Sequence, residues 1–207
     1  MSSDLDKLML LLPPPRAEVV GPPWHRSRLD IGFEFPEDYR QFVDRYGAGI
    51  ITSDNEMLPF TIDAPCSVPT GGGPSSGFNA LAEKQLSQVR PLFVFDGADE
   101  DYWGGPVYPI YPDPGGLWAW GENHEGDMFF WLTQDSDPNA WPVVMWARGP
   151  ATTYVFEGGM VSSLLSLLSG QHPVVDWIAK PQLRWTMHTD WEHSGLSSSA
   201  GFGTTTR

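Results

Sequence analysis

The chain has 207 residues, of which 41% are hydrophobic and 18% are charged, and it carries a net charge of −14 with an isoelectric point near 4.5. This composition is typical of a globular protein and excludes a disordered chain. Surfaces that bind nucleic acids are normally basic, so the acidity argues against a groove for phosphates. It favours a basic partner, which such a field attracts and steers, or it serves solubility alone.

Cys66 is the only cysteine in the chain, which excludes an intramolecular disulfide and a zinc site built from cysteines. Residues 1–15 start acidic, and their apolar run Leu8–Leu12 is short and followed by prolines, unlike a secretory signal. No stretch of the sequence approaches the ~20 apolar residues needed to span a bilayer. We therefore expect a cytoplasmic protein that makes no contact with a membrane.

The first fifty residues are organised around one regular helix. Leu5–Leu12 is expected to form one or two helical turns, and Gly21–Arg28 is expected to be a loop. Within Phe35–Ile51, Pro36 suits the first position of an amphipathic helix, and two acidic residues follow it in the first turn. Gly47 is expected to end this helix in a left-handed conformation. Four large side chains recur at helical spacing on one face: Tyr39, Phe42, Val43 and Tyr46.

The next sixty residues are less regular. Met57–Ile62 predicts a short strand, and Pro65–Gly77 is a glycine- and proline-rich insertion without the motif of a phosphate-binding loop. A second helix is predicted over Phe78–Val89, with Asn79 as its cap. A buried strand is then expected over Leu92–Phe95. The apolar side chains of the second helix are Leu81, Ala82, Leu86 and Val89.

The following part of the sequence predicts an antiparallel sheet. Four short segments are rich in aromatic and β-branched residues: Leu117–Trp120, Met128–Thr133, Val143–Ala147 and Thr152–Phe156. The links between them have hairpin length and turn-forming composition, so consecutive strands are expected to pair as a meander. Met160–Leu168 then predicts a helix whose serines face away from an apolar stripe. Helices at both ends of such a sheet predict an α+β fold.

Large aromatic rings are concentrated in this sheet. Because neighbouring side chains in a strand point to opposite faces, about half of the rings are expected in the core, with the C-terminal extension covering the other face. Stacking of nucleic-acid bases on them is disfavoured by the acidity of the chain. The rings are Trp118, Trp120, Phe129, Phe130, Trp131, Trp141 and Trp146.

Two strings of residues resemble the SUKH superfamily, also called Smi/Knr-like proteins. The first runs from Phe35 to Ile50 and has the pattern Phe-Pro-x-x-Tyr-Arg-x-Phe followed by Tyr-Gly-x-Gly-Ile. The second, Trp118–Thr133, has the spacing Trp-Gly…Gly-Asp…Trp. Members of this family are mostly bacterial immunity proteins that neutralise toxins. The resemblance implies a SUKH-like α+β domain, an antiparallel β-meander flanked by N-terminal and C-terminal helices.

The resemblance also implies a division of the chain. It covers residues 24–170, which leaves residues 1–23 as an N-terminal extension. Residues 171–194 are rich in aromatic side chains and are expected to pack on the domain. Residues 195–207 are rich in serine, threonine and glycine, which predicts a disordered tail.

A cluster of acidic residues follows the strand predicted at Leu92–Phe95. Paired carboxylates act as general acid and base on glycosides or bind Ca²⁺, but the spacing here lacks the alternating order of a calcium loop. Protein interfaces favour aromatic anchors within a polar rim. We therefore interpret six residues of this loop as a surface for a protein partner: Asp96, Asp99, Glu100, Asp101, Tyr102 and Trp103.

Two turns of the predicted meander add acidic residues to this surface. Those expected to contact the partner are Glu122, His124, Glu125, Asp127, Asp135 and Asp137. A lone histidine in a turn, without a placed nucleophile, makes no catalytic triad. The set His188, Asp190 and His193 matches no common spacing of metal ligands. The sequence thus predicts no catalytic residue, no metal and no cofactor.

The leading hypothesis, by resemblance, is an immunity protein that binds a cognate toxin domain and occludes its active site. The toxin is expected to act on nucleic acids and therefore to present a basic surface, which an acidic face occupies in competition with phosphates. An intracellular scaffold or regulatory module of the same fold is the alternative, and a hydrolase that uses the acidic residues 96–101 is a third. The protein is expected to be a monomer or a weak homodimer.

Overall fold

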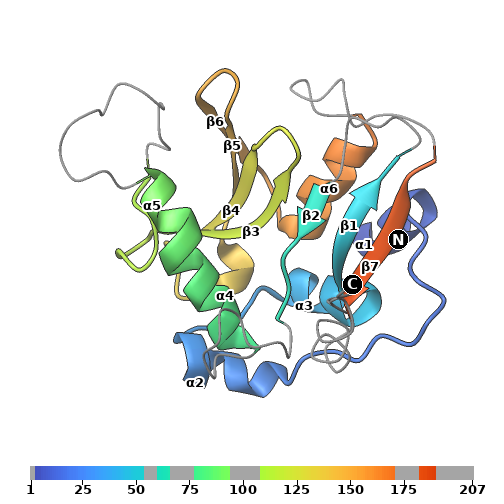
Figure 1. The fold of residues 1–207 in the computed structure, drawn as a ribbon, viewed down its shortest axis with the longest axis horizontal. Helices are drawn as coiled ribbons and strands as arrows, with labels where there is room; N and C mark the ends of the chain where they lie inside the picture. Colours follow the sequence, from blue (N-terminus) through green and yellow to red (C-terminus); the bar gives the residue numbers. More distant parts are fainter. Residues whose placement is uncertain (1–2, 54–59, 66–76, 94–107, 171–181, 190–207) are drawn as a thin grey trace, which may run out of the picture.

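The computed structural model describes residues 3–53, 60–65, 77–93, 108–170 and 182–189 of the protein (Figure 1). In this part of the chain seven strands form one antiparallel sheet in the order β6-β5-β4-β3-β2-β1-β7. The strands are β1 (Ala48–Thr52), β2 (Phe60–Ile62), β3 (Leu117–Asn123), β4 (Met128–Leu132), β5 (Val143–Ala147), β6 (Thr152–Phe156) and β7 (Arg184–Thr189). The helical segments are α1 (Asp4–Leu11), η1 (Trp24–Arg26), α2 (Ser27–Ile31), α3 (Glu37–Tyr46), α4 (Phe78–Lys84), η2 (Gln85–Val89), α5 (Arg90–Phe93), η3 (Pro138–Ala140) and α6 (Met160–Leu168). The fold is therefore α+β, as predicted.

The meander predicted from the sequence is confirmed. β3, β4, β5 and β6 pair consecutively, with Trp118 opposite Trp131. β2 and β1 continue the sheet, and β7, which the sequence did not predict as a strand, lies beside β1 (Figure 1). A Cβ on Gly49 would lie 2.6 Å from the ring of Trp185, so the glycine in β1 makes room for this tryptophan.

The predicted amphipathic helix is confirmed as α3, and its apolar side chains Tyr39, Phe42, Val43 and Tyr46 are buried. Pro36, however, has an extended ψ of 143° and precedes the helix as its N-cap instead of occupying the first turn. Gly47 has φ 71° and ψ −169°. This combination is accessible to glycine but is not left-handed helical, and it sends the chain directly into β1.

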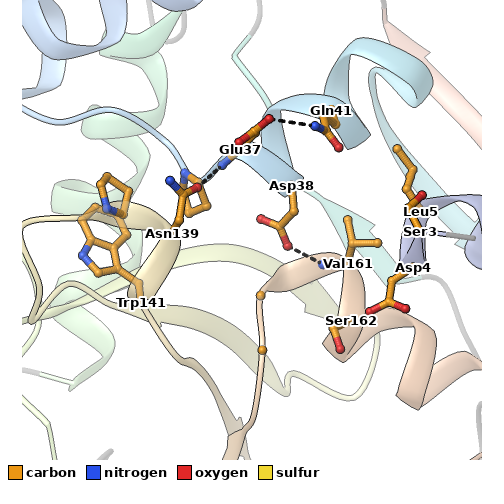
Figure 2. A pocket seen from close by; sticks show the side chains of 14 residues that line it. Ser3, Asp4, Leu5, Glu37, Asp38, Gln41, Asn139, Trp141, Val161 and Ser162 are labelled. Atoms are coloured by element: carbon orange, nitrogen blue, oxygen red, sulfur yellow. Dashed lines mark hydrogen bonds between the residues drawn. The ribbon is translucent and has the colours of Figure 1, made fainter. Parts of the chain in front are cut away.

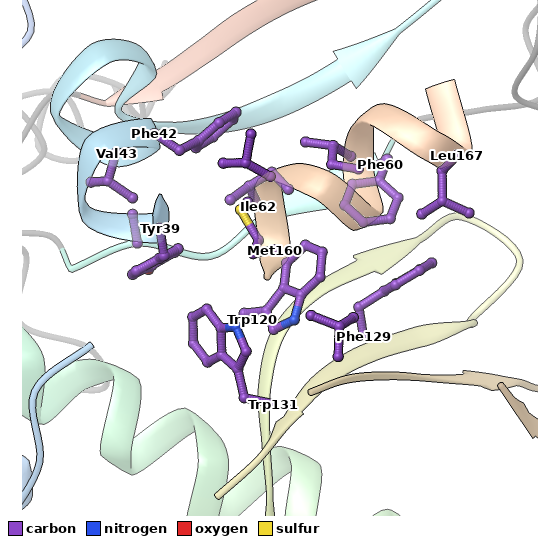
Figure 3. Close-up of a cluster of buried hydrophobic side chains, with 14 of the residues drawn as sticks. Tyr39, Phe42, Val43, Phe60, Ile62, Trp120, Phe129, Trp131, Met160 and Leu167 are labelled. Atoms are coloured by element: carbon purple, nitrogen blue, oxygen red, sulfur yellow. The ribbon is translucent and has the colours of Figure 1, made fainter. Parts of the chain in front are cut away.

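Apolar side chains pack on both faces of the sheet. On one face, α1, α3 and α6 enclose a core in which Trp120, Phe129 and Trp131 meet the side chain of Met160 (Figure 3). On the other face, the helical segment from α4 to α5 covers a second core. Every residue of β4 and β5 is buried, because helices cover both sides of these central strands. The seven aromatic rings of the meander and its links are all buried, whereas about half were expected in the core, because helices cover both faces of the sheet.

Several local predictions are wrong. Ser27–Ile31, assigned partly to a loop, forms α2. Asn79 lies inside α4, which Gly77 precedes as N-cap, and the expected strand at Leu92–Phe95 begins instead as helix α5. Pro91 lies in the helical turn that directly follows the π-helical Gln85–Val89, and Phe93 packs edge to face on Phe130 and Trp146, which keeps the chain helical.

The faces of two helices also differ from the prediction. In the segment from α4 to α5, Gln85 is 2% exposed and Leu86 is 47% exposed, because Gln85–Val89 is π-helical and the wider turn rotates the buried face. In α6, Ser163 is buried and its hydroxyl donates to the carbonyl of Gly159 at 2.9 Å. The second face of the sheet is covered by helices and not, in the described part of the chain, by the C-terminal extension.

Candidate partner-binding site

The structure does not bring the predicted contact residues together on one surface. Residues 96–103 lie outside the described part of the chain. The turn after β3 adjoins Met128, the first residue of β4, whereas the link to β5 follows Leu132, the last residue of β4. The two groups of acidic residues therefore lie at opposite ends of the same strand.

The turn between β3 and β4 is a hydrogen-bonded unit. Asn123 donates its amide to Asp127 at 2.8 Å and accepts the Asp127 backbone N–H at 2.9 Å. The other carboxylate oxygen of Asp127 accepts the backbone N–H of Arg148 at 2.8 Å. Asp127 is buried, so it stabilises the turn and does not offer its carboxylate to a partner, contrary to the prediction. His124 and Glu125 are exposed at the tip of the turn.

The link between β4 and β5 is exposed but locally bonded. Asp135 accepts the backbone N–H of Asp137 at 2.8 Å, and Asp137 caps η3 by accepting the N–H of Asn139 at 3.0 Å. The side-chain oxygen of Asn139 in turn accepts the first N–H of α3, at Glu37, at 2.8 Å. These residues position the start of α3, and one side-chain oxygen of each of them accepts a hydrogen bond from within the protein.

A groove of about 450 Å³ lies between α5 and the turn that joins β3 to β4. Its lining residues are Pro91, Leu92, Glu122, Gly126, Met128, Trp146 and Arg148. Met128 and Trp146 are 5% exposed and form an apolar base, while Leu92 is 54% exposed on the α5 side. We call this feature the α5 groove. It contains Glu122 and adjoins Glu125, two of the residues predicted to bind a partner.

The α5 wall of the groove is fixed by three contacts. Phe93 meets Trp146 edge to face at 4.9 Å between ring centroids. Arg90 donates to the carbonyl of Ile110 at 2.8 Å. The buried amide of Gln85 donates to the carbonyl of Leu117 and accepts the N–H of Ala119, both at 3.1 Å. Because β2 pairs only with Gly121–Asn123 of β3, this side chain supplies the partner that the N–H of Ala119 would have found in a longer β2. The carbonyl of Leu117 also accepts the N–H of Tyr111 at 3.1 Å.

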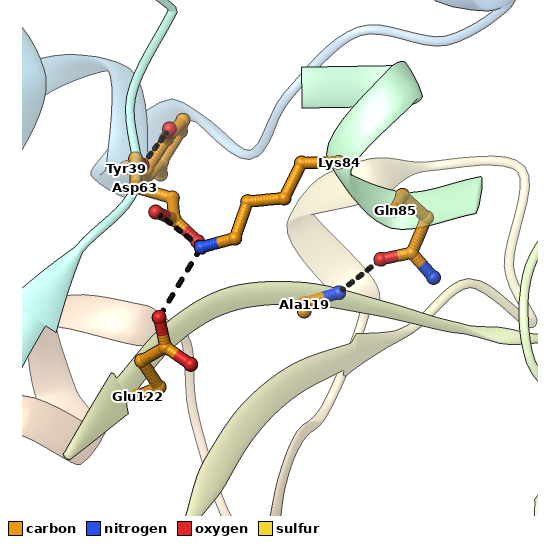
Figure 4. Close-up of polar contacts among 6 residues, drawn as sticks. All are labelled: Tyr39, Asp63, Lys84, Gln85, Ala119 and Glu122. Atoms are coloured by element: carbon orange, nitrogen blue, oxygen red, sulfur yellow. Dashed lines mark hydrogen bonds and ion pairs between the residues drawn. The ribbon is translucent and has the colours of Figure 1, made fainter. Parts of the chain in front are cut away.

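A polar cluster at the end of α4 involves the groove residue Glu122 (Figure 4). Lys84 lies 2.7 Å from one carboxylate oxygen of Asp63 and 3.4 Å from Glu122. Burial raises the pKa of Asp63, and the ammonium of Lys84 offsets this only in part. Burial by itself lowers the pKa of Lys84, but the two carboxylates outweigh it and raise that pKa. The ion pair ties α4 to the end of β2 and orients Glu122 beside the groove.

A second hollow, of about 540 Å³, lies where α1, α3, η3 and α6 meet (Figure 2). Here the carboxylate of Asp38 accepts the N–H of Val161 at 2.9 Å and caps α6 from another helix. A Cβ on Gly159 would overlap this carboxylate, so glycine is needed at the N-cap. Burial raises the pKa of Asp38, against the lowering effect of the backbone donors. The carboxylate is used to join α3 to α6.

Among the described residues, no group of three or more His, Cys, Asp or Glu side chains converges in a way that could hold a metal ion. The side chain of His188 lies outside the part that the structure describes, and so do the residues Asp190 and His193. None of the described helices is both long and apolar enough to cross a bilayer.

Comparison of the chain with models of protein families, with curated proteins and with solved structures finds no match. What the α5 groove can bind therefore follows from its shape and chemistry. An apolar base with an exposed leucine on one side, and with Glu122 and Arg148 among its other lining residues, suits a protein surface that carries an apolar anchor beside charged residues.

Sequence reasoning missed the residues that hold the groove in place. Gln85 carried a usable signal, because it follows Phe78 by seven positions and precedes Val89 by four, which is the spacing of a buried helical stripe. The pairing of Lys84 with Asp63 joins residues 21 positions apart, and the capping of α6 by Asp38 joins residues 123 apart. No pattern of neighbouring residues in the sequence predicts such long-range contacts.

Proposed function

We propose that this protein is a SUKH-like immunity protein that binds a cognate toxin domain and blocks its active site without catalysing a reaction. The observation that carries the proposal is the α5 groove, an apolar recess lined also by Glu122 and Arg148, with the exposed Glu125 next in sequence to its lining residue Gly126, on a chain of net charge −14. The net negative charge of such a protein attracts a basic toxin surface over a distance. Burial of apolar side chains in the groove then stabilises the complex.

The order of elements supports the same proposal. α3 ends at Tyr46 and Gly47, a meander follows, and α6 closes the unit. The second string that resembles the family also has a structural explanation here: Trp120 and Trp131 are core residues, and Asp127 stabilises the turn. Gly126 has φ 86°, and a Cβ there would lie 3.0 Å from the side chain of Arg148. The motif thus builds the turn that forms one wall of the groove.

In the proposed complex, Leu92 is the apolar contact at the edge of the groove, and Glu125 and Glu122 face basic residues of the toxin. Central apolar contacts dominate the affinity of protein interfaces, whereas charges at the rim mainly change the association rate and its dependence on salt. Occlusion needs no reactive group, because a toxin whose phosphate-binding surface is covered cannot engage its nucleic-acid substrate.

The test is a pull-down of the tagged protein from its native cells at low and at high salt, with partners identified by mass spectrometry. Leu92→Asp and Glu125→Lys baits are compared with two matched controls far from the groove in sequence, Leu29→Asp and Glu18→Lys, which change exposed residues in the same way. We expect one basic partner that is captured by the wild type and both controls, released by salt, and lost with Leu92→Asp.

Co-expression of that partner then decides between neutralisation and simple binding. We expect the partner to be toxic alone and harmless with the wild-type protein, and to regain toxicity with Leu92→Asp. Several unrelated partners that are not toxic would favour a scaffold instead. Capture of the same partner by Leu92→Asp and the wild type with equal yield would exclude the α5 groove as the binding site.

A further inference from the structure

The edge strand β6 has features that set it apart from most exposed sheet edges. It is the first strand in the order of the sheet, so within the described part of the chain only β5 pairs with it. Its five residues, Thr152–Phe156, are β-branched or aromatic and include no charge, proline or glycine. All five pair with β5 without a shift in register. Charges, prolines and bulges are the usual means by which proteins keep edge strands from pairing with other chains.

The side chains beside this edge can be covered by another strand. Val155 is 52% exposed and lies opposite the buried Val144, on the face of the sheet that the helices from α4 to α5 cover elsewhere. A hollow of about 500 Å³ lies between β6 and the helices α6 and α1, with Val155 and Phe156 on the strand side and Leu165 among the serines of α6. The hollow leaves room beside β6 for side chains of a second strand.

The charge around β6 differs from that of the whole protein. Asp4 and Lys7, which line the hollow, form an ion pair at 2.7 Å. Glu157 follows the strand, and Arg148 precedes the turn that leads into it. These two acidic and two basic groups balance each other, although the chain as a whole carries −14. Two copies of this acidic protein can approach here without placing like charges opposite each other.

We propose that two copies of the protein associate through β6, antiparallel and about a two-fold axis, so that one sheet continues from copy to copy. In a pairing centred on Tyr154, Thr153 of each copy faces Val155 of the other, and Glu157 faces Ala151. Each cross-strand pair is then free of like charges, and Val155 leaves water. A two-fold axis uses the same surface on both copies, which is the commonest arrangement of homodimers.

The proposed dimer is expected to be weak because its interface is small. Five residues on each side form a smaller contact than the roughly 1,200–2,000 Å² of stable interfaces. The net charge of each copy also opposes association over distances that salt screens. Association is therefore expected at high protein concentration and moderate salt, and it uses an edge of the sheet that is separate from the α5 groove.

Sedimentation velocity of the full chain, from micromolar to near-millimolar concentration, tests this assignment. We expect a shift from monomer to dimer for the wild type and for the control Thr186→Lys, which adds a charge to an exposed position of the opposite edge strand β7. Thr153→Lys and Val155→Lys are each expected to abolish the shift, because they place a charge within the pairing. Circular dichroism verifies that each variant is folded.

A monomer at every concentration would overturn the proposal, as would a dimer that survives both β6 variants or is lost with Thr186→Lys. A crosslink gives an independent result. Tyr154→Cys in a Cys66→Ser background places the two thiols opposite each other, within the Cα separation of a disulfide. We expect a covalent dimer on mild oxidation, and none with Thr186→Cys in the same background; the reverse outcome would place the contact at β7.

Discussion

Replacing Gln85 with leucine tests whether one side-chain amide holds the helical segment from α4 to α5 on the sheet. The substitution keeps the approximate shape of the side chain but removes a donor and an acceptor. The N–H of Ala119, which now donates to the amide oxygen at 3.1 Å, is then left without its partner, whereas the carbonyl of Leu117 loses one bond but still accepts the N–H of Tyr111 at 3.1 Å. Gln85 is 2% exposed, so water does not easily replace it.

The expected loss follows from the hydrogen bonds removed. The unpaired N–H of Ala119 costs about 1–3 kcal/mol, and the bond lost at the carbonyl of Leu117 costs about 0.5–1.5 kcal/mol. Burying the leucine instead of the amide recovers about 1–2 kcal/mol. We therefore expect the free energy of unfolding to fall by about 1–3 kcal/mol, which for a chain of this size lowers the melting temperature by about 2–4 °C per kcal/mol.

Urea unfolding followed by tryptophan fluorescence measures this loss, with Gln88→Leu as the matched control on an exposed turn of the same segment. The control is expected to change the stability by less than about 0.5 kcal/mol. Hydrogen exchange should show faster exchange at the Ala119 amide in Gln85→Leu. A variant as stable as the wild type, with a protected Ala119 amide, would refute the idea that the amide replaces a missing strand.

Three further substitutions probe other contacts. Asp38→Ala removes the cap of α6 and is expected to cost about 1–2 kcal/mol at neutral pH, measured by urea unfolding. Burial raises the pKa of Asp38 above 3.8; the folded state then binds the proton more tightly, so stability falls as pH rises from 3.8 through the raised pKa, and Asp38→Asn should remove this slope. Tyr46→Phe removes a buried hydrogen bond of 2.6 Å and should cost about 1–2 kcal/mol in thermal unfolding. Because burial raises the pKa of Tyr46 from 10.0 to about 12, stability contributed by this phenol falls as pH rises between these values, and alkaline unfolding of Tyr46→Phe should lack that contribution. Lys84→Met leaves Asp63 without its ammonium and should cost about 1.5–3 kcal/mol; adding Asp63→Asn should recover part of it, and equal stabilities of wild type and Lys84→Met would contradict the role of the pair.

The sequence by itself determined the elements whose signals are local. α3 was predictable because its apolar residues repeat with the period of a helix and glycine follows its last turn. β5, β6 and α6 have the bounds that composition and turn residues indicated. Short links between strands left antiparallel pairing as the simplest arrangement, and the structure has it. These features depend on residues within a few positions of each other.

Only the tertiary structure decided how these elements meet. Pro91 and the apolar residues after it read as the start of a strand, but Phe93 packs on Trp146 and the chain stays helical. β7 has no strong strand signal, and it becomes a strand because the edge of β1 is free to pair with it. The acidic residues of the two turns are similar in sequence, yet they lie at opposite ends of β4.

The α5 groove shows the same division. Its apolar base was predictable as core from the strand pattern, and Glu122 was predictable as a turn-side acid. Its walls were not, because they depend on Gln85 reaching β3 and on Lys84 reaching Asp63 across the fold. Such contacts join residues that are distant in the chain. They form only in the folded state, so no local pattern in the sequence predicts them.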